Sequence, residues 1–189
     1  MMGTRDPQGE AVRKWAAQNP GASAGTFAEA AKFGDLLVLT VLGRIADKVI
    51  EMAGPENFTG KTVIDTTIPV ADAPPLNGVM RFTTGPNESL AEKTQARLPR
   101  AHLVKAFNSV GAGRMVNPHY DEGIPTMFLC GDDEGAKAQV SEIIRQFGWD
   151  PFDCGSLVSA RALEPLCILW CIPGFRSNQW THAFKLLTH

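Results

Sequence analysis

The sequence predicts an α/β fold with a doubly wound, mostly parallel sheet, and three observations carry this prediction. Short apolar runs alternate with amphipathic stretches of helix length along the chain. The apolar runs are continuous rather than alternating, which is typical of strands covered on both faces. The length of 189 residues, with 44% hydrophobic and 20% charged residues, fits a globular chain with one main core.

Four apolar runs are the expected strands, at residues 36–42, 62–65, 103–107 and 127–130. The first is the longest, and its length suits a strand, because a membrane-spanning helix needs roughly 20 apolar residues. Strand, helix, strand, helix is the order found in doubly wound domains.

Capping signals place the helices between these strands. Thr26 and Glu29 form a capping-box pattern that opens a helix to about residue 33. Asn87 is the expected N-cap of a helix over 88–98, and Asp132 that of a helix ending at Phe147. Further helices are expected at residues 8–18, 43–52 and 157–172.

The longest stretch without a regular pattern is 67–87, which contains four prolines. Long loops inside compact domains are usually functional or disordered. Since this loop leaves the carboxyl end of the 62–65 strand, we expect it to border a ligand crevice rather than to be a tolerated insertion.

Composition and missing motifs exclude several classes of function. A net charge of −2 gives no basic footprint for nucleic acid or a membrane surface. Four cysteines and no leader pattern favour a reduced, cytoplasmic protein. The histidines and cysteines have no metal-ligand spacing, and serine hydrolase, P-loop and zincin motifs are missing, so no metal is expected.

Two segments carry candidate chemistry. Thr4 and Arg5 lie where a strand ends at the start of the chain, and an arginine beside a hydroxyl suits the 2′-phosphate of NADP. The alternative interpretation, with no role in binding, is a turn with a helix N-cap. Asn108 and Ser109 follow the 103–107 strand and bring amide and hydroxyl groups to the sheet edge. An ordinary strand-to-helix turn remains the alternative there.

These segments, in order along nearly the whole chain, resemble the deazaflavin-dependent NADP oxidoreductases (NADPH:coenzyme F-420 reductase-like proteins) and the related reductase domain of metalloreductases. The resemblance rests on Gly-Thr-Arg-Asp-Pro at 3–7, Val-Ile-Asp-Thr-Thr at 63–67, Val-Lys-Ala-Phe-Asn-Ser-Val at 104–110, Pro-Thr-Met-Phe at 125–128, Gly-Asp-Asp at 131–133, Gly-Trp-Asp-Pro at 148–151 and Ala-Arg-Ala-Leu-Glu-Pro-Leu at 160–166.

The resemblance implies a Rossmann-type NADP(H) domain at 1–155 and a small C-terminal helical segment at 156–189, usually in homodimers. It places the 2′-phosphate at Thr4 and Arg5, the middle of the cofactor at Thr40, Val41 and Leu42, and the nicotinamide at Asn108, Ser109 and Val110. The chain departs from the pattern at Thr40–Leu42, where the family usually has Ala-Val-Pro, and at Ile68-Pro69, where it has Asn-Pro.

A larger departure is that no Gly-x-Gly-x-x-Gly turn occurs in the sequence. In the family this turn follows a first strand and opens a helix that binds the pyrophosphate. Met1 and Met2 fall where the family's second strand ends, so we expect the first strand-turn-helix unit to be missing from the chain.

The expected function is hydride transfer between NADP(H) and a flavin-like or deazaflavin acceptor. Because the cofactor carries this chemistry, the pattern designates no catalytic acid or base. The alternative is a truncated, non-catalytic relative that has lost dinucleotide binding and keeps a dimerising scaffold. The apolar C-terminal segment favours a homodimer in either case.

Overall fold

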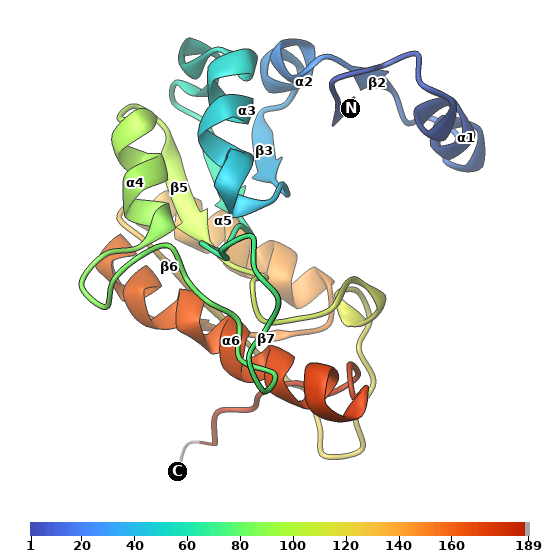
Figure 1. Ribbon diagram of the computed structural model, residues 1–189. Helices are drawn as coiled ribbons and strands as arrows, with labels where there is room; N and C mark the ends of the chain where they lie inside the picture. The colour runs from blue at the N-terminus through green and yellow to red at the C-terminus, as the bar shows by residue number, and fades with distance from the viewer. Residues whose placement is uncertain (188–189) are drawn as a thin grey trace.

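The computed structural model describes residues 1–187, so the last two residues of the expected C-terminal segment lie outside the described residues. Its main sheet has the strand order β3-β4-β5-β6-β7, and β1 and β2 form a separate parallel pair (Figure 1). The strands are β1 (Met2–Gly3), β2 (Ala24–Gly25), β3 (Leu36–Leu39), β4 (Thr62–Asp65), β5 (His102–Lys105), β6 (Thr126–Gly131) and β7 (Asp150–Asp153).

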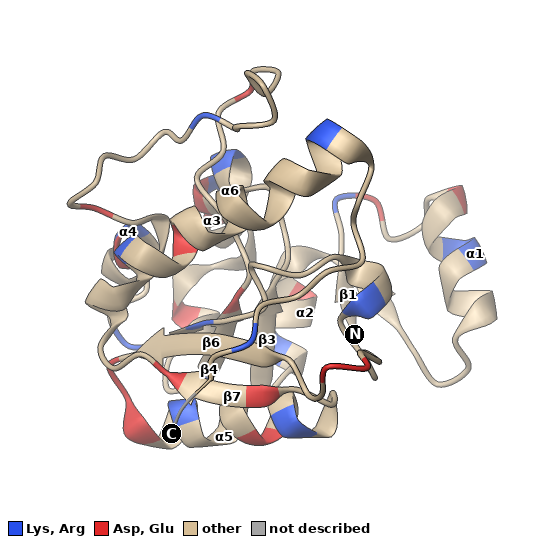
Figure 2. Cartoon of the chain, turned by 90° about the horizontal axis from the view of Figure 1, so that it is seen from below, with Lys and Arg blue, Asp and Glu red and all other residues tan. Residues whose placement is uncertain are grey.

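Helices cover both faces of the main sheet. The helices of the described residues are α1 (Glu10–Gln18), α2 (Phe27–Phe33), α3 (Ala46–Ala53), α4 (Leu90–Arg97), α5 (Glu134–Gln146) and α6 (Ala160–Ser177). Of these, α1 lies away from the main sheet and has no buried residue (Figure 1). Figure 2 shows α5 on one face of the sheet and α3, α4 and α6 on the other. One apolar cluster joins β4 and β5 to α2 and α3, and a second joins them to α5. The doubly wound α/β fold, Rossmann-like and mostly parallel, is confirmed.

The sheet differs from the expectation in the direction of β6. β3, β4 and β5 are parallel, but β6 runs antiparallel to β5. The connection from β5 to β6 contains only a short 3-10 turn, Ala112–Arg114, and no crossover helix, which a parallel neighbour would require. Two strands, β2 and β7, were not expected, because β2 is very short and β7 has a proline between charged ends.

Two helix caps were assigned to the wrong residue. Ser89, not Asn87, caps α4, because its side chain accepts a hydrogen bond from the N–H of Glu92. Asp133, not Asp132, caps α5 by accepting from the N–H of Ala136. Asp132 instead accepts a hydrogen bond from the N–H of Leu157, which fixes the start of the last helical segment. The capping box of Thr26 and Glu29 is confirmed.

The expected helix at 157–172 begins with a 3-10 turn, Leu157–Ser159, and continues as α6 to Ser177. Leu157–Ser177 is long and apolar enough to cross a membrane, by length and composition alone. In this structure it packs on the rest of the chain, with Glu164 and Trp170 buried. One side of the helix is therefore buried in the fold, while Leu169 and Phe175 on it are exposed.

The long loop at 67–87 contains no helix or strand, as expected, and is stabilised by isolated bridges between Val70 and Phe82 and between Leu76 and Val79. It lies against α6, because Ile68 packs with a cluster formed by Cys167, Trp170 and Cys171. Its role as the border of an active site stays a prediction.

Candidate functional site

The carboxyl ends of β3, β4 and β5 meet at one edge of the sheet, because these three strands are parallel. Thr40 follows β3, Thr66 follows β4 and Asn108 lies three residues beyond β5. The hydroxyl of Thr66 donates to the carbonyl of Leu39 at 3.1 Å, which ties the ends of β3 and β4 together. We take this edge as the candidate site.

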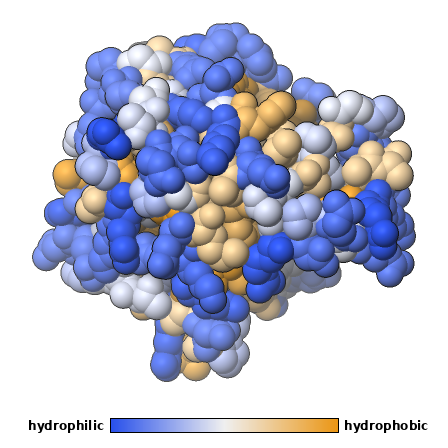
Figure 3. Space-filling model, turned by 90° about the horizontal axis from the view of Figure 1, so that it is seen from above, coloured by the Kyte–Doolittle hydropathy of each residue, from blue (hydrophilic) through white to orange (hydrophobic). Residues whose placement is uncertain are grey.

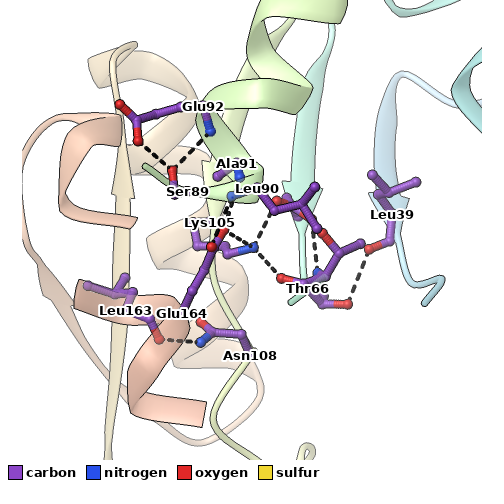
Figure 4. Close-up of polar contacts among 12 residues, drawn as sticks. Leu39, Thr66, Ser89, Leu90, Ala91, Glu92, Lys105, Asn108, Leu163 and Glu164 are labelled. Carbon is purple, nitrogen blue, oxygen red and sulfur yellow. Dashed lines mark hydrogen bonds and ion pairs between the residues drawn. The ribbon is translucent and has the colours of Figure 1, made fainter. Parts of the chain in front are cut away.

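A buried charged network lies directly beneath the edge (Figure 4). Asp65 and Lys105 end β4 and β5 and face each other in register. Lys105 Nζ lies 2.9 Å from Asp65 Oδ2 and 3.2 Å from Glu164 Oε1. These side chains are at most 1% exposed. Charges this deeply buried are tolerated only when they are paired and hydrogen-bonded, so the network holds the two strands and α6 in one geometry.

Glu164 also caps a helix from a distance. Its carboxylate accepts hydrogen bonds from the N–H groups of Leu90 and Ala91, both at 2.9 Å, in the first turn of α4. Lys105 donates further to the carbonyl of Thr67, whose hydroxyl donates to Asp65 at 2.7 Å. Two carboxylates and one ammonium leave one excess negative charge, which the amides and dipole of α4 offset.

The chain leaves β5 through a strained residue. Phe107 has φ of 58°, in the left-handed region that bulky side chains rarely adopt. The side-chain amide of the next residue, Asn108, donates to the carbonyl of Leu163 at 2.6 Å. Strained residues persist where their surroundings fix them, and they cluster at functional sites. Here the burial of Phe107 and the bond to α6 fix the direction of the 108–110 segment.

The predicted residues fall into two groups by accessibility. Arg5 is exposed and makes no ion pair among residues 1–187, and Thr4 beside it is half-buried. Thr40 and Leu42 are also exposed, so a ligand can reach both strand ends. The remaining predicted residues are less open: Val41 and Val110 are half-buried, and Asn108 and Ser109 are 8% and 7% exposed.

A cleft of about 400 Å³ lies between β1 and β3. β1 forms one wall, and β3 with the following Thr40 and Val41 forms the other. Apolar residues of α2 and α3 form its floor, and Figure 3 shows apolar surface, in orange and tan, between hydrophilic side chains on the side of these helices. The structure thus places β1 across the cleft from the end of β3, with Thr4 and Arg5 following β1 just outside the cleft lining.

The edge fits one part of a dinucleotide better than another. The exposed guanidinium of Arg5, with the hydroxyl of Thr4, fits a phosphate group. The turn after β3 does not form an open phosphate cradle, because a Cβ on Gly43 would lie 2.0 Å from the carbonyl oxygen of Ile68. The chain itself fills that turn. The residues present therefore fit the 2′-phosphate end of NADP, while this turn offers no cradle for the pyrophosphate.

Sequence reasoning missed the buried network. A signal was available, because Asp65 and Lys105 each end an otherwise apolar strand and would be neighbours in a parallel sheet. Glu164 gave no such signal, because its spacing of three residues from Arg161 on the expected helix predicts a pair between these two side chains. Arg161 instead pairs with Glu92 at 2.7 Å, and its hydrogen bonds lower the pKa of that carboxyl.

Three of the four cysteines, Cys130, Cys167 and Cys171, are buried, and Cys154 is half-buried. Burial raises the pKa of Cys130 to about 12, which makes it a poor metal ligand and nucleophile. Within residues 1–187 no group of histidine, cysteine or carboxylate side chains is arranged to hold a metal ion.

No protein-family model matches the chain. Among curated proteins, it is similar to metalloreductase STEAP3 of Rattus norvegicus, with 40% identity over 90 residues, which is 46% of this chain and 18% of that protein. It is also similar to metalloreductase STEAP2 of Homo sapiens, with 37% identity over 87 residues, which is 46% of this chain and 17% of that protein. The chain spans less than a fifth of the length of these curated relatives.

Among solved structures, the chain is similar to a proposed F420-dependent NADP reductase from Arthrobacter sp. FB24, with 27% identity and a TM-score of 0.90 over 98% of this chain and 87% of that one. A reductive aminase from Aspergillus terreus, solved with NADPH, shares 15% identity over 90% of this chain and 53% of that one, with a TM-score of 0.62. The second likeness shows the fold alone. Together these similarities show a Rossmann-like α/β fold. The relatives named as reductases are an NADP reductase and two metalloreductases.

Proposed function

We propose that this chain is the nucleotide-binding part of an NADPH-dependent oxidoreductase that transfers a hydride between NADP(H) and a flavin-like or deazaflavin acceptor. The observation that carries the proposal is the free, exposed guanidinium of Arg5 at the carboxyl end of β1. The similarity to an NADP reductase over 98% of the chain supports it.

In this function Arg5 and Thr4 bind the 2′-phosphate, and the segment after β3 borders the middle of the cofactor. The nicotinamide supplies the hydride when NADP(H) is bound, and the chain supplies position and exclusion of water. Asn108 acts here as a positioning residue, because its amide is already bonded to Leu163 and fixes the segment that contains Ser109 and Val110.

Cofactor choice tests the proposal. We expect the protein to bind NADPH in preference to NADH, because Arg5 pairs with the extra phosphate. Arg5→Ala should weaken NADPH binding by about 1.5–3 kcal/mol, the value of a hydrogen bond to a charged group. Arg13→Ala, at an exposed arginine on the neighbouring helix α1, is the matched control and should change little. Equal affinities of the wild type for NADH and NADPH in titration calorimetry would refute the proposal.

A second candidate, a non-catalytic scaffold, is favoured by the open cleft and by the filled turn at Gly43. Both candidates include a homodimer, supported by the exposed apolar side chains of Leu169 and Phe175 on α6. Sedimentation velocity at micromolar concentration tests the assembly, and a monomer at all concentrations would contradict it. A measurement of NADPH oxidation with a flavin or deazaflavin as acceptor distinguishes the two candidates, because only the enzyme would turn over.

A further inference from the structure

The segment at 108–111, which follows β5 at the candidate site, rests on α6 at both of its ends. At one end, the side-chain amide of Asn108 donates to the carbonyl of Leu163 at 2.6 Å. At the other end, a Cβ on Gly111 would lie 3.1 Å from the ring of Trp170, so the backbone runs close against α6 there. The position of α6 therefore sets the position of this segment.

The first residues of the loop at 67–87 are supported by the same helix. Ile68 packs against a buried cluster on α6. The carbonyl of Thr67 accepts a hydrogen bond from Lys105, whose ammonium group also pairs with Glu164 of α6. Two segments that are far apart in the sequence, one after β4 and one after β5, thus depend on one helix for their placement.

A single side chain, Glu164, joins this turn of α6 to the rest of the fold (Figure 4). Glu164 is the residue after Leu163, and it is 1% exposed. Its Oε1 accepts from the N–H of Ala91 at 2.9 Å and lies 3.2 Å from Lys105 Nζ, while its Oε2 accepts from the N–H of Leu90 at 2.9 Å. Both carboxylate oxygens are therefore occupied by donors from α4 and β5.

We propose that Glu164 is a positioning residue for the nicotinamide end of the candidate site, and that it acts through the carbonyl of Leu163 on Asn108. The proposal rests on the proposed function, in which the nicotinamide lies at the segment that Asn108 begins. The partners of Glu164 are in α4 and β5, whereas Thr4 and Arg5 follow β1. Its effect is therefore confined to one end of the cofactor.

Glu164→Gln is the variant that tests this role with the smallest change in shape. A glutamine side chain has one acceptor oxygen and one donor group, so it cannot satisfy three donors, and its amide nitrogen must face one of them. The substitution leaves Asp65 and Lys105 as a neutral buried pair, so no charge in the network loses its last partner. We therefore expect the variant to fold and the turn of α6 at Leu163 to shift.

Titration calorimetry with two probes separates the two ends of the cofactor. NADPH contains the nicotinamide, whereas adenosine 2′,5′-bisphosphate contains only the end that carries the 2′-phosphate. We expect Glu164→Gln to weaken NADPH binding about tenfold, because the segment after β5 must then be ordered again when the nicotinamide binds. Its affinity for adenosine 2′,5′-bisphosphate should equal that of the wild type.

Glu92→Gln is the matched control, because it makes the same substitution at a second carboxylate that joins α4 to α6. Glu92 pairs with Arg161 at 2.7 Å, and the two side chains are 26% and 37% exposed. This ion pair lies at the surface of the two helices rather than at the turn that holds Asn108. Glu92→Gln should leave the affinities for both probes unchanged.

Two further variants keep the test open if Glu164→Gln does not fold. Glu164→Asp keeps the negative charge and shortens the side chain by one methylene group, so it should weaken NADPH binding less than Glu164→Gln and leave the bisphosphate unaffected. Asn108→Leu removes the hydrogen bond to Leu163 without touching the charges and should also weaken NADPH binding alone. Because both sites act through one contact, Asn108→Leu combined with either Glu164 variant should lose little more than the more damaging single change.

Three results would overturn the role of Glu164. Equal losses of affinity for NADPH and for the bisphosphate would show that Glu164 only stabilises the fold. Unchanged NADPH affinity in the folded Glu164 variants would show that the turn of α6 does not position the segment. Full additivity with Asn108→Leu would assign the two residues to separate routes. A wild type that binds neither probe would instead refute the proposed function, and the role of Glu164 with it.

Discussion

The centre and the open side of this sheet are built from similar strands but differ in what surrounds them. In β4 all four residues are buried, and the strand has a partner on each side and helices on both faces. In β3 only Leu39 is fully buried, and one edge borders the cleft. Val38 and Ile64, register partners on one face, are 52% and 3% exposed. An apolar run therefore predicts a strand, but its neighbours decide how much stability it contributes.

The largest effect should come from breaking the buried network in the centre. Lys105→Met leaves the carboxylates of Asp65 and Glu164 without their cation in the interior, so we expect a loss of about 3–5 kcal/mol in the free energy of unfolding. Lys137→Met is the matched control, because Lys137 is also largely buried but pairs with the more exposed Glu134 and Asp153. Urea denaturation measures the free energy of unfolding of both variants. Equal losses in Lys105→Met and Lys137→Met would contradict the expectation that the buried network contributes more.

The next effect compares the two register partners directly. Ile64→Ala should cost about 2–5 kcal/mol of unfolding free energy, because it opens a cavity in a packed core. Val38→Ala should change stability by only about 0.5 kcal/mol or less, since half of its side chain is already in water. A loss at Val38 as large as that at Ile64 would show that the open side is covered in solution.

The smallest effect concerns the ion pair of Glu92 and Arg161 beside the network. The hydrogen bonds from Arg161 hold the pKa of Glu92 below its usual 4.5, so the pair stabilises the fold above about that pH and loses this contribution as the pH falls further. Arg161→Gln should therefore lower the urea midpoint slightly at pH 7, and the difference from the wild type should shrink toward pH 3. A constant difference would exclude the titration of Glu92 as its source.

The sequence predicted the central strands because burial on both faces leaves a continuous apolar run. The direction of β6 was not readable, since it depends on a connection without a crossover helix, and β7 lacks the apolar pattern of the interior strands. At the candidate site, the position of Thr4 and Arg5 just after a strand was predicted correctly, whereas Thr40 was expected inside a strand over 36–42 and lies just beyond β3, which ends at Leu39. Their roles toward NADP(H) stay predictions.

The sequence carried a signal for the pair of Asp65 and Lys105 but none for Glu164, which joins them only through the tertiary structure. Glu164 lies far along the chain from both strands, yet it caps α4 and pairs with Lys105. The left-handed conformation of Phe107 gave no signal either, because bulky residues rarely adopt it.

The contrast between the two regions is tested most directly by amide hydrogen exchange of the unmodified 189-residue protein. The account predicts that the N–H of Ile64, directed toward β3, exchanges only when the core opens, with a free energy near that of global unfolding. It predicts that the N–H groups of Val38 and Gly3, directed into the cleft, exchange quickly and with little protection. Protection of Val38 and Gly3 as strong as that of Ile64 would contradict the account, because both edges of the cleft would then already be paired.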